Sequence, residues 1–249
     1  MTDDNTTQVS PAPPRIILVP TPIGNLGDIT LRALEALRSA DVIACEDTRR
    51  ARVLLQHFEI SKPTISLHEH NEASRSQDLI RRVRDENQTI AVVSDAGMPG
   101  ISDPGLRLTA ACRKAEVTIE VLPGACAVPL ALVGSGFPTE EFFFGGFLPP
   151  KSGRRIRILG EALERESATS MFYESPHRII KTLTALAELD DERSVCVARE
   201  LTKKFETYHH GTASVLLQHF ASTPPKGEMV LLIAPKKLPK FLRDDLEES

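Results

Sequence analysis

Tryptophan is absent from this sequence of 249 residues, tyrosine occurs twice, and cysteine occurs four times. The cysteines Cys45, Cys112, Cys126 and Cys196 form no C-x-x-C pair, which argues against a zinc site and a disulfide framework. So few large aromatic side chains also make extensive base-stacking platforms unexpected. We therefore expect a protein of the reducing cytosol that holds no metal.

Long apolar runs are missing as well. The runs at residues 16–19 and 128–133 are much shorter than the roughly 20 apolar residues of a membrane-spanning helix. The first 14 residues are polar and lack the basic-then-apolar order of a secretory signal. We expect no membrane span, a disordered tail over residues 1–14 and a charged tail over residues 237–249.

A positive net charge is also lacking, because the formal charge is −4. That value alone counts against a nucleic-acid partner, since phosphate binding depends on lysine and arginine. The acidic residues concentrate at the chain ends, however, and basic residues cluster in the interior of the sequence. Either solvated helix faces or contacts with a phosphate backbone would account for these clusters. The candidate RNA-binding residues are Arg49, Arg50, Arg52, Lys151, Arg154, Arg155 and Lys204.

What the chain does contain is a regular alternation of short apolar runs and amphipathic stretches. The runs, rich in isoleucine and valine, predict buried strands at residues 16–19, 42–45, 64–67, 90–93 and 118–122. Helical spacing between them predicts helices around residues 31–37, 51–58, 79–83 and 106–112. Such alternation predicts an α/β lobe with a parallel sheet covered by helices on both faces. Ligands of such sheets bind beyond the carboxyl ends of the strands.

A change of pattern over residues 134–150, rich in glycine, proline and phenylalanine, indicates a lobe boundary. We place an N-terminal α/β domain at residues 15–136 and a C-terminal α/β domain at residues 137–236. Strands are predicted at residues 142–147, 170–173, 194–198, 205–209 and 229–234, with helices near 154–164, 176–189 and 213–220. The strands near 196 and 207 have no room for a helix between them, so the second sheet should be mixed.

Three loops follow predicted strands and carry unusual residues. The loop at residues 20–28 is glycine-rich, but it matches neither the dinucleotide fingerprint nor a Walker motif, and a plain turn explains it equally well. The loop at residues 94–105, SDAGMPGISDPG, favours close approach of the backbone to a ligand, and Asp103 should also cap a helix opened by Pro104. The loop from residue 123 begins a helix with small residues, which suit either a flat cofactor or close packing.

These loops form part of an ordered set of motifs. The set comprises LVPTPIGNLGDIT at 18–30, ACEDTR at 44–49, SLHEHNE at 66–72, the 94–105 loop, PGA at 123–125, FYESPHR at 172–178, VARELTK at 197–203 and GEMVLL at 227–232. In this order they resemble the ribosomal RNA small subunit methyltransferase I family over about residues 15–235. The family usually has threonine where this chain has Met98, which weakens a side-chain contact there but not main-chain contacts.

The resemblance implies a two-lobed tetrapyrrole methylase-like fold, a parallel-sheet N-terminal lobe and a mixed-sheet C-terminal lobe, with S-adenosyl-L-methionine bound between them and commonly a homodimer. It also implies 2′-O-methylation of a cytidine ribose in 16S ribosomal RNA of the small ribosomal subunit. The cofactor-binding residues that it implies are Pro22, Gly24, Asp95, Gly97, Pro99, Ile101, Ser102, Pro123, Gly124, Ala125, Phe147, Pro149 and Met229.

Methyl transfer to a hydroxyl requires positioning, and a nearby carboxylate, histidine or lysine can accept the proton. Candidate catalytic residues are Asp28, Glu46, Asp47, Glu200 and Lys203, with His68 as a further possibility. A helix start explains Asp47 equally well, and phosphate contact is the better interpretation of Lys203 and Lys204. Two rival functions stay open: a tetrapyrrole C-methyltransferase of the same fold, and a non-catalytic RNA-binding protein of ribosome assembly.

Overall fold

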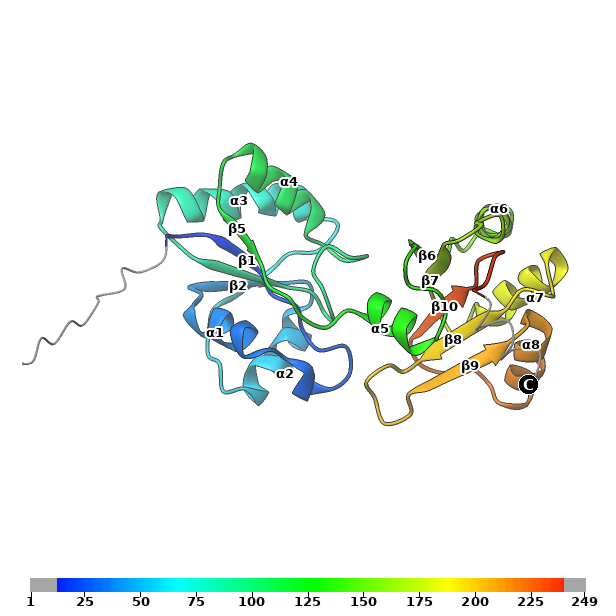
Figure 1. Ribbon diagram of the computed structural model, residues 1–249. Helices are drawn as coiled ribbons and strands as arrows, with labels where there is room; N and C mark the ends of the chain where they lie inside the picture. Colours follow the sequence, from blue (N-terminus) through cyan, green and yellow to red (C-terminus); the bar gives the residue numbers. More distant parts are fainter. Residues whose placement is uncertain (1–12, 240–249) are drawn as a thin grey trace, which may run out of the picture. The chain divides into compact units, whose positions relative to one another are not determined.

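The computed structural model describes residues 13–239, which divide into two compact units (Figure 1). Unit 1 comprises the chain up to Thr21 together with Asp28–Gly124, and unit 2 comprises Pro22–Gly27 together with the chain from Ala125. The tails expected at residues 1–14 and 237–249 lie mainly outside the described residues. No helix within residues 13–239 is long and apolar enough to cross a membrane.

Unit 1 is built on a five-stranded sheet in which every pair of neighbouring strands is parallel. The strand order is β3-β2-β4-β1-β5. The strands are β1 Ile16–Leu18, β2 Val42–Cys45, β3 Thr64–Ser66, β4 Ile90–Val93 and β5 Ile119–Val121. Strands β1, β2 and β4 are buried at every residue, because helices cover both faces of the sheet as a parallel sheet requires. The predicted parallel-sheet lobe is confirmed.

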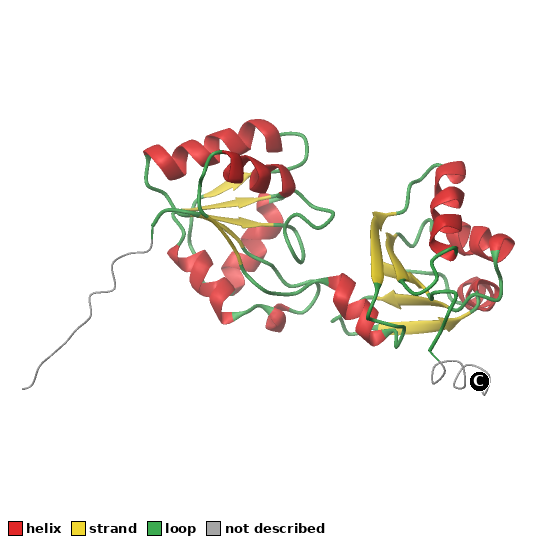
Figure 2. Cartoon of the chain, turned by 45° about the horizontal axis from the view of Figure 1, so that its top comes forward, coloured by secondary structure: helices red, strands yellow, loops and turns green. Residues whose placement is uncertain are grey.

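Four helices form the outer layers of unit 1, which Figure 2 shows above and below the strands. They are α1 Leu31–Ser39, α2 Thr48–His57, α3 Glu72–Asp85 and α4 Leu106–Lys114. Helices α1 and α2 pack on one face of the sheet, through Leu37 and Leu55. Helices α3 and α4 pack on the other face, through Leu79 and Leu108. The Thr30 hydroxyl caps α1 by accepting a hydrogen bond from the Ala33 N–H at 3.0 Å, as predicted.

The helices that follow two neighbouring strands, β1 and β4, pack on opposite faces of the sheet. Strands β1 and β4 are neighbours, but the chain leaves β1 toward α1 on one face and leaves β4 toward α4 on the opposite face. The two connections therefore diverge to opposite faces of the sheet at the carboxyl ends of adjacent strands. In open α/β sheets this switch point is where ligands bind.

Unit 2 contains a five-stranded mixed sheet of order β6-β7-β10-β8-β9. Its strands are β6 Phe142–Phe147, β7 Thr169–Glu174, β8 Val195–Arg199, β9 Thr207–Gly211 and β10 Met229–Ile233. Strands β6 and β7 are parallel, whereas the β7–β10, β10–β8 and β8–β9 pairs are antiparallel. The predicted mixed sheet is confirmed. Strand β9 begins at Thr207 rather than at residue 205, because Phe205 lies in the preceding turn with its side chain 65% exposed.

The helices of unit 2 divide unequally between the two faces of its sheet (Figure 1). They are α5 Ala127–Gly134, α6 Ser152–Leu163, α7 Ile179–Leu189 and α8 Ala213–Ser222. Helices α6, α7 and α8 share one core with Leu231 and Ile233 of β10, and α5 shares the other core with Val230 and Leu232 of the same strand. Because successive side chains of β10 point to opposite faces of the sheet, this strand contributes to both cores.

The packing of α5 determines where unit 2 begins. Val128, Ala131 and Leu132 of this helix are buried in the core that β8 and β10 line. Unit 2 consequently starts after Gly124, earlier than the division at residues 136 and 137 that the glycine-rich stretch suggested. A change of composition marked the loop after α5, but the contacts of α5 place the boundary before it.

A buried ion pair stabilises unit 2. The Glu174 side chain is fully buried, pairs with Arg178 Nη2 at 2.9 Å and accepts a hydrogen bond from the Thr182 hydroxyl at 2.7 Å. Its Oε1 also accepts from the Ser175 N–H at 2.8 Å. Arg178 Nη1 donates to the Leu148 carbonyl at 3.0 Å, so the pair links β7, α7 and the loop after β6.

Replacing Glu174 by alanine should lower the free energy of unfolding by about 1–3 kcal/mol, because it removes the carboxylate partner of the partly buried Arg178 and leaves the buried Thr182 hydroxyl without its acceptor. Chemical denaturation of the purified variant measures the change. Glu161→Ala is the matched control, since it removes an exposed i,i+4 partner of Arg157 on α6, a pair of a kind that contributes at most about 0.5 kcal/mol. Equal effects of the two substitutions would contradict the structural role of Glu174.

Candidate functional site

The loops after β1 and β4 are joined at the carboxyl edge of the unit 1 sheet. The Thr21 and Gly97 main chains form an isolated bridge, with N–H to carbonyl distances of 3.0 and 2.9 Å. The buried Thr21 hydroxyl donates to the Ser94 carbonyl at 3.3 Å. The Ser94 hydroxyl in turn donates to the Gly97 carbonyl at 3.2 Å. These hydrogen bonds therefore hold the main chains of both loops in place at the switch point.

The loop at residues 94–105 has a backbone that only its glycines allow. Gly97 and Gly100 have φ angles of 80° and 87°, in a region where a side chain is strained. At Gly105, with φ of 139°, a Cβ atom would lie 3.0 Å from the Gly100 nitrogen. Ser102 also has a positive φ of 60°. The unusual composition of this loop thus serves a compact shape, at whose tip Ile101 and Ser102 are exposed.

The helix after this loop is capped differently from the prediction. Helix α4 begins at Leu106 with Gly105 as its N-cap, and Asp103 makes no capping bond. Instead the buried Glu72 of α3 accepts hydrogen bonds from the N–H groups of Gly105, Arg107 and Leu108, at 2.8, 3.0 and 3.3 Å. The prediction that Asp103 caps this helix was wrong, because a distant carboxylate satisfies the donors and leaves Asp103 available.

The loop after β5 closes the same edge. A Cβ atom on Gly124 would lie 2.6 Å from Cβ of Pro20, so the ends of β1 and β5 approach as closely as glycine permits. The structure therefore gathers part of the predicted cofactor set at one edge of unit 1. These residues are Asp95, Gly97, Pro99, Ile101 and Ser102 in the β4–α4 loop, and Pro123 and Gly124 in the loop after β5.

Three carboxylates, those of Glu46, Asp95 and Asp103, lie close together at this edge. Asp95 accepts a hydrogen bond from the Asp47 N–H at 3.1 Å and pairs with Arg50 at 3.3 Å. Burial, together with the charge of Asp95, raises the pKa of Glu46 above its ordinary value. Burial, together with the charges of Glu46 and Asp95, raises the pKa of Asp103 to about 6, against a hydrogen bond from Ser94 that lowers it. At pH 7 Asp103 is therefore mostly ionised, yet it binds a proton more tightly than an ordinary aspartate, as a proton acceptor should.

Asp47 has a different role from these three carboxylates. It is the N-cap of α2, accepting from the Arg49 N–H at 2.8 Å, and its other oxygen pairs with the Arg49 guanidinium at 2.7 Å. These hydrogen bonds from Arg49 hold the pKa of Asp47 well below its usual range. The helix-start interpretation of Asp47 agrees with this geometry, and its carboxylate is a poor proton acceptor.

Unit 2 presents another group of predicted residues along one edge of its sheet. Lys203 Nζ lies 2.9 Å from Glu200 Oε1 and 2.8 Å from Glu228 Oε2. Burial lowers the pKa of Lys203, but the hydrogen bonds to Glu228 and Glu200 outweigh it and hold the pKa above its ordinary value. Gly24 packs directly on this lysine, since a Cβ there would overlap Lys203 Cγ. Lys203 thus anchors the Pro22–Gly27 segment to unit 2 and stays charged.

Glu200 takes part in the same network. Burial raises its pKa, but hydrogen bonds from Lys203 and from the Glu228 N–H leave it below the ordinary value. Gly227, with φ of 82°, leaves no room for a Cβ beside Glu200. The remaining candidate, Asp28, lies exposed at the end of the short 3-10 helix η1, Leu26–Asp28. Glu200 therefore lacks the raised pKa of Asp103, and Asp28 lacks its burial.

The other predicted contacts of unit 2 are Phe147, Met229, Ala125, Pro149 and Pro22. Phe147 is 59% exposed and its ring lies 5.2 Å from the Tyr173 ring. Met229 pairs with Glu174 at the start of β10, and its side chain is buried in the core, so its main chain alone is available to a ligand. Ala125, Pro149 and Pro22 are partly exposed in loops.

The predicted RNA-binding residues fall into two groups. Arg49 and Arg50 are engaged by Asp47 and Asp95, so their charges are already matched. Lys204 lies 5.5 Å from the centre of the Phe205 ring. Like Lys204, four other predicted residues form no ion pair within residues 13–239: Arg52, Lys151, Arg154 and Arg155.

Metal and thiol chemistry have no support in the described chain. Residues 13–239 contain no group of three or more histidine, cysteine, aspartate or glutamate side chains placed to hold a metal ion. Burial raises the pKa of Cys45 and Cys112 to about 11 and that of Cys196 to about 12. These thiols are core residues and are not nucleophiles.

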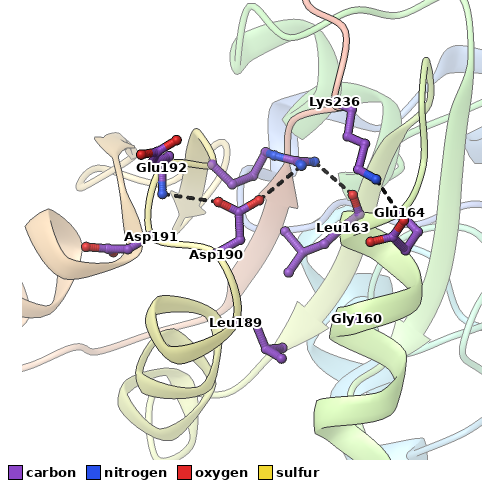
Figure 3. A pocket seen from close by; sticks show the side chains of 9 residues that line it. Gly160, Leu163, Glu164, Leu189, Asp190, Asp191, Glu192 and Lys236 are labelled. Carbon is purple, nitrogen blue, oxygen red and sulfur yellow. Dashed lines mark hydrogen bonds and ion pairs between the residues drawn. The ribbon is translucent and has the colours of Figure 1, made fainter.

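A hollow of about 410 Å³ in unit 2 is lined by none of the predicted site residues (Figure 3). Its cations are engaged: Arg193 pairs with Asp190 at 3.1 Å, and Lys236 pairs with Glu164 at 2.7 Å. Asp191 and Glu192 add further negative charge. An anionic ligand such as RNA would find no free cation there.

Comparison with known proteins finds a family model and relatives that match most of the chain. The family model described as Tetrapyrrole (Corrin/Porphyrin) Methylases matches residues 15–217. Ribosomal RNA small subunit methyltransferase I of Synechocystis is 47% identical over 94% of this chain and 85% of its own length. The protein of the same name from Vibrio cholerae is 50% identical over 94% of this chain and 81% of its own length.

Solved structures show the same architecture at lower sequence identity. A diphthine synthase matches with a TM-score of 0.70 and 16% identity, over 94% of each chain. A uroporphyrin-III-C-methyltransferase from Thermus thermophilus matches with a TM-score of 0.63 and 18% identity, over 91% of this chain and 99% of that chain. At such identities the likeness concerns the fold alone, and it confirms the two-lobed tetrapyrrole methylase fold.

Proposed function

The chain belongs to the ribosomal RNA small subunit methyltransferase I family of tetrapyrrole methylases, and on that premise we propose that it methylates the 2′-hydroxyl of a cytidine in small-subunit ribosomal RNA. The methyl donor is S-adenosyl-L-methionine. The observation that carries the proposal is the glycine-rich β4–α4 loop at the carboxyl edge of the unit 1 sheet, which contains the raised-pKa carboxylate of Asp103.

The residues at this edge suit the donor. Gly97 is buried and its main-chain groups bond to Thr21, so it holds the loop in shape, whereas Ile101, Ser102 and Gly124 form an exposed surface. Such a surface binds a flat adenosine group through main-chain hydrogen bonds and close contact. We assign donor binding to Asp95, Gly97, Pro99, Ile101, Ser102, Pro123 and Gly124 of unit 1. Resemblance to the family adds Pro22, Gly24, Ala125, Phe147, Pro149 and Met229 of unit 2 as further proposed contacts.

When bound, the donor supplies an electrophilic methyl group on a sulfonium. The task of the chain is to hold the ribose hydroxyl in line with that group and to accept its proton. Asp47, Glu200 and Lys203 are held in ion pairs, which leaves Asp103 and Glu46 as the acceptors that the geometry favours. Asp103 was missing from the sequence-predicted catalytic set, because its position before Pro104 and Gly105 suggested a helix cap.

The two rival functions differ from this proposal in testable ways. A tetrapyrrole C-methyltransferase shares the fold, but the solved examples are 16–20% identical to this chain, whereas the ribosomal RNA methyltransferases are 41–50% identical. A non-catalytic ribosome-assembly protein has no use for a methyl donor, so titration calorimetry with S-adenosylmethionine separates that possibility. We further propose that the protein acts in the cytosol as a homodimer, and on a folded small ribosomal subunit in which the target nucleotide is exposed.

Loss of the gene should remove one 2′-O-methylcytidine from small-subunit ribosomal RNA and leave other modifications unchanged. Mass-spectrometric mapping of ribosomal RNA from such cells measures this directly. Wild-type protein should restore the modification, and Gly97→Trp should not, because a bulky side chain at φ of 80° distorts the loop that receives the donor. An unaltered methylation map would rule the proposed function out.

A further inference from the structure

The first main-chain N–H groups of helix α6 lack the hydrogen-bond acceptor that a capping side chain usually supplies. Lys151 is the N-cap, and its side chain makes no capping hydrogen bond. The first main-chain bond of the helix runs from the Arg155 N–H to the Lys151 carbonyl at 3.0 Å. Within the described chain, the N–H groups of Ser152, Gly153 and Arg154 have no acceptor, and all three residues are exposed. Three free donors and the positive end of the helix dipole thus face solvent.

The side chains around this helix end are basic and free. Lys151 and Arg154 are exposed and form no ion pair with any residue of the described chain. Arg157, one turn further along, is by contrast engaged by Glu161. Positive charge is therefore left unmatched at the first turn of α6 and neutralised immediately after it.

A buried guanidinium provides an independent sign of a ligand. Arg155 is only 5% exposed, its Nη1 donates to the Pro150 carbonyl at 3.2 Å, and its Nε is buried without a partner. Within residues 13–239 no carboxylate pairs with it. Among the other partly buried arginines of unit 2, Arg178 pairs with Glu174 and Arg193 with Asp190. Arg165 also has a buried Nε without a partner, but its guanidinium lies 3.8 Å from the centre of the Phe143 ring. Since burying an unpaired charge is costly, Arg155 is arranged for an anion that comes from outside the chain.

The same end of α6 has space for an occupant. A Cβ atom placed on Gly153 would meet no atom within 4 Å. Strand β6 leads into this helix from the edge of the sheet, and it carries Phe142 and Phe147, 53% and 59% exposed. Aromatic rings beside a cationic groove are the usual means of holding single-stranded nucleic acid, with bases on the rings and phosphates on the cations.

We propose that the first turn of α6, with Lys151, Arg154 and Arg155, is a binding site for a backbone phosphate of the ribosomal RNA substrate. The inference rests on the proposed function, because that function supplies RNA as the partner. Main-chain donors at a helix start bind phosphate well, and the flanking free cations extend the site along a chain of phosphates. The carboxylate of the methyl donor is the competing occupant, but a single carboxylate would leave Lys151 and Arg154 unused.

The test is Gly153→Glu, which places a carboxylate in the open space at the helix start. Binding is measured by filter retention of small ribosomal subunits taken from cells lacking the gene, over a series of salt concentrations. Loss of one phosphate contact should weaken binding about tenfold at moderate salt and reduce the slope of log K against log salt by about 1. The melting temperature should stay equal or rise, because a carboxylate is favourable at a helix amino end. Arg155→Gln should reduce the same slope.

Gly160→Glu is the matched control, because the same change of charge occurs on the same helix, again with no atom within 4 Å of the added Cβ. It should leave the salt slope at the wild-type value. If Gly153→Glu binds subunits as Gly160→Glu does, the inference is overturned. Calorimetry with S-adenosylmethionine separates the occupants: weakened donor affinity in Gly153→Glu with unaltered subunit binding would assign the site to the donor and overturn the inference. Failure of wild-type protein to transfer methyl groups would refute the proposed function, while the binding data still decide the phosphate site.

Discussion

Replacement of Asp103 by asparagine is expected to lower kcat for methyl transfer by about 10²–10⁴-fold, the usual contribution of a positioned proton acceptor. Asparagine keeps the size and the polar contacts of the side chain but cannot take a proton at neutral pH. Burial and the charges of Glu46 and Asp95 raise the pKa of Asp103 to about 6, so the wild-type rate should rise with pH through this value and then level. Single-turnover methylation of small ribosomal subunits across pH 5–8 measures both effects.

Protein stability distinguishes this role from a structural one. Because the folded-state pKa of Asp103 is raised from an ordinary value of 3.8, the folded protein binds the proton more tightly than the unfolded chain does. The ionised carboxylate therefore reduces stability above pH 6, and the effect disappears below the unfolded-state pKa. Asp103→Asn should melt at a higher temperature than wild type at pH 7.5 while losing activity.

The control for this variant is Asp85→Asn, which changes an exposed carboxylate at the end of α3 in the same unit. It should keep wild-type kcat and the wild-type pH profile. An Asp103→Asn variant with full activity, or one whose loss of activity follows a lower melting temperature, would count against Asp103 as the acceptor.

Replacement of Gly124 by alanine is expected to lower kcat/KM by about 100-fold, the effect of displacing reacting groups by about 1 Å. The added methyl would lie 2.6 Å from the rigid Pro20 ring, so the ends of β5 and β1 must move apart. Both ends carry loops of the proposed donor site. Calorimetry with S-adenosylmethionine should show weakened binding in parallel with the kinetic loss.

Gly160→Ala provides the comparison, since the same methyl at that position meets no atom within 4 Å. Its kcat/KM should equal that of the wild type. If Gly124→Ala bound the donor as tightly as Gly160→Ala does, the loop after β5 would have no part in the donor site.

Local sequence pattern was sufficient for most of the fold. The strands at residues 42–45 and 90–93 were predicted with their observed bounds, because runs of isoleucine, valine and alanine between polar segments are typical of strands buried on both faces. Close spacing of β8 and β9 correctly indicated an antiparallel pair. The start of α4 could not be predicted locally, because Glu72, far away in the sequence, supplies its cap.

The division into units depends on contacts that no local pattern reports. The Pro22–Gly27 segment lies between two elements of unit 1, yet Gly24 packs on Lys203 of unit 2. The small residues at the start of α5 predicted a helix, but its membership of unit 2 follows from Val128 and Leu132 in the second core. Tertiary packing therefore determines that the Pro22–Gly27 segment and α5 belong to unit 2.

The same limit applies to the site. The glycines and prolines of the 94–105 loop predicted a ligand-binding loop, because a plain turn rarely needs so many of these residues in one connection. Charge partners were not readable from sequence: Asp47 and Lys203 seemed as available as Asp103, and the structure engages the first two in ion pairs. The distinguishing property, a carboxylate buried beside two others, arises when β2 and β4 become neighbours.

The most direct test of the central claim is a crystal structure of the protein with S-adenosylhomocysteine, the product of the donor. The account predicts electron density for this molecule at the carboxyl edge of the unit 1 sheet, against the main chain of Gly97 and Gly124. Density for the molecule at any other place, with this edge empty in crystals grown at saturating ligand, would contradict the account.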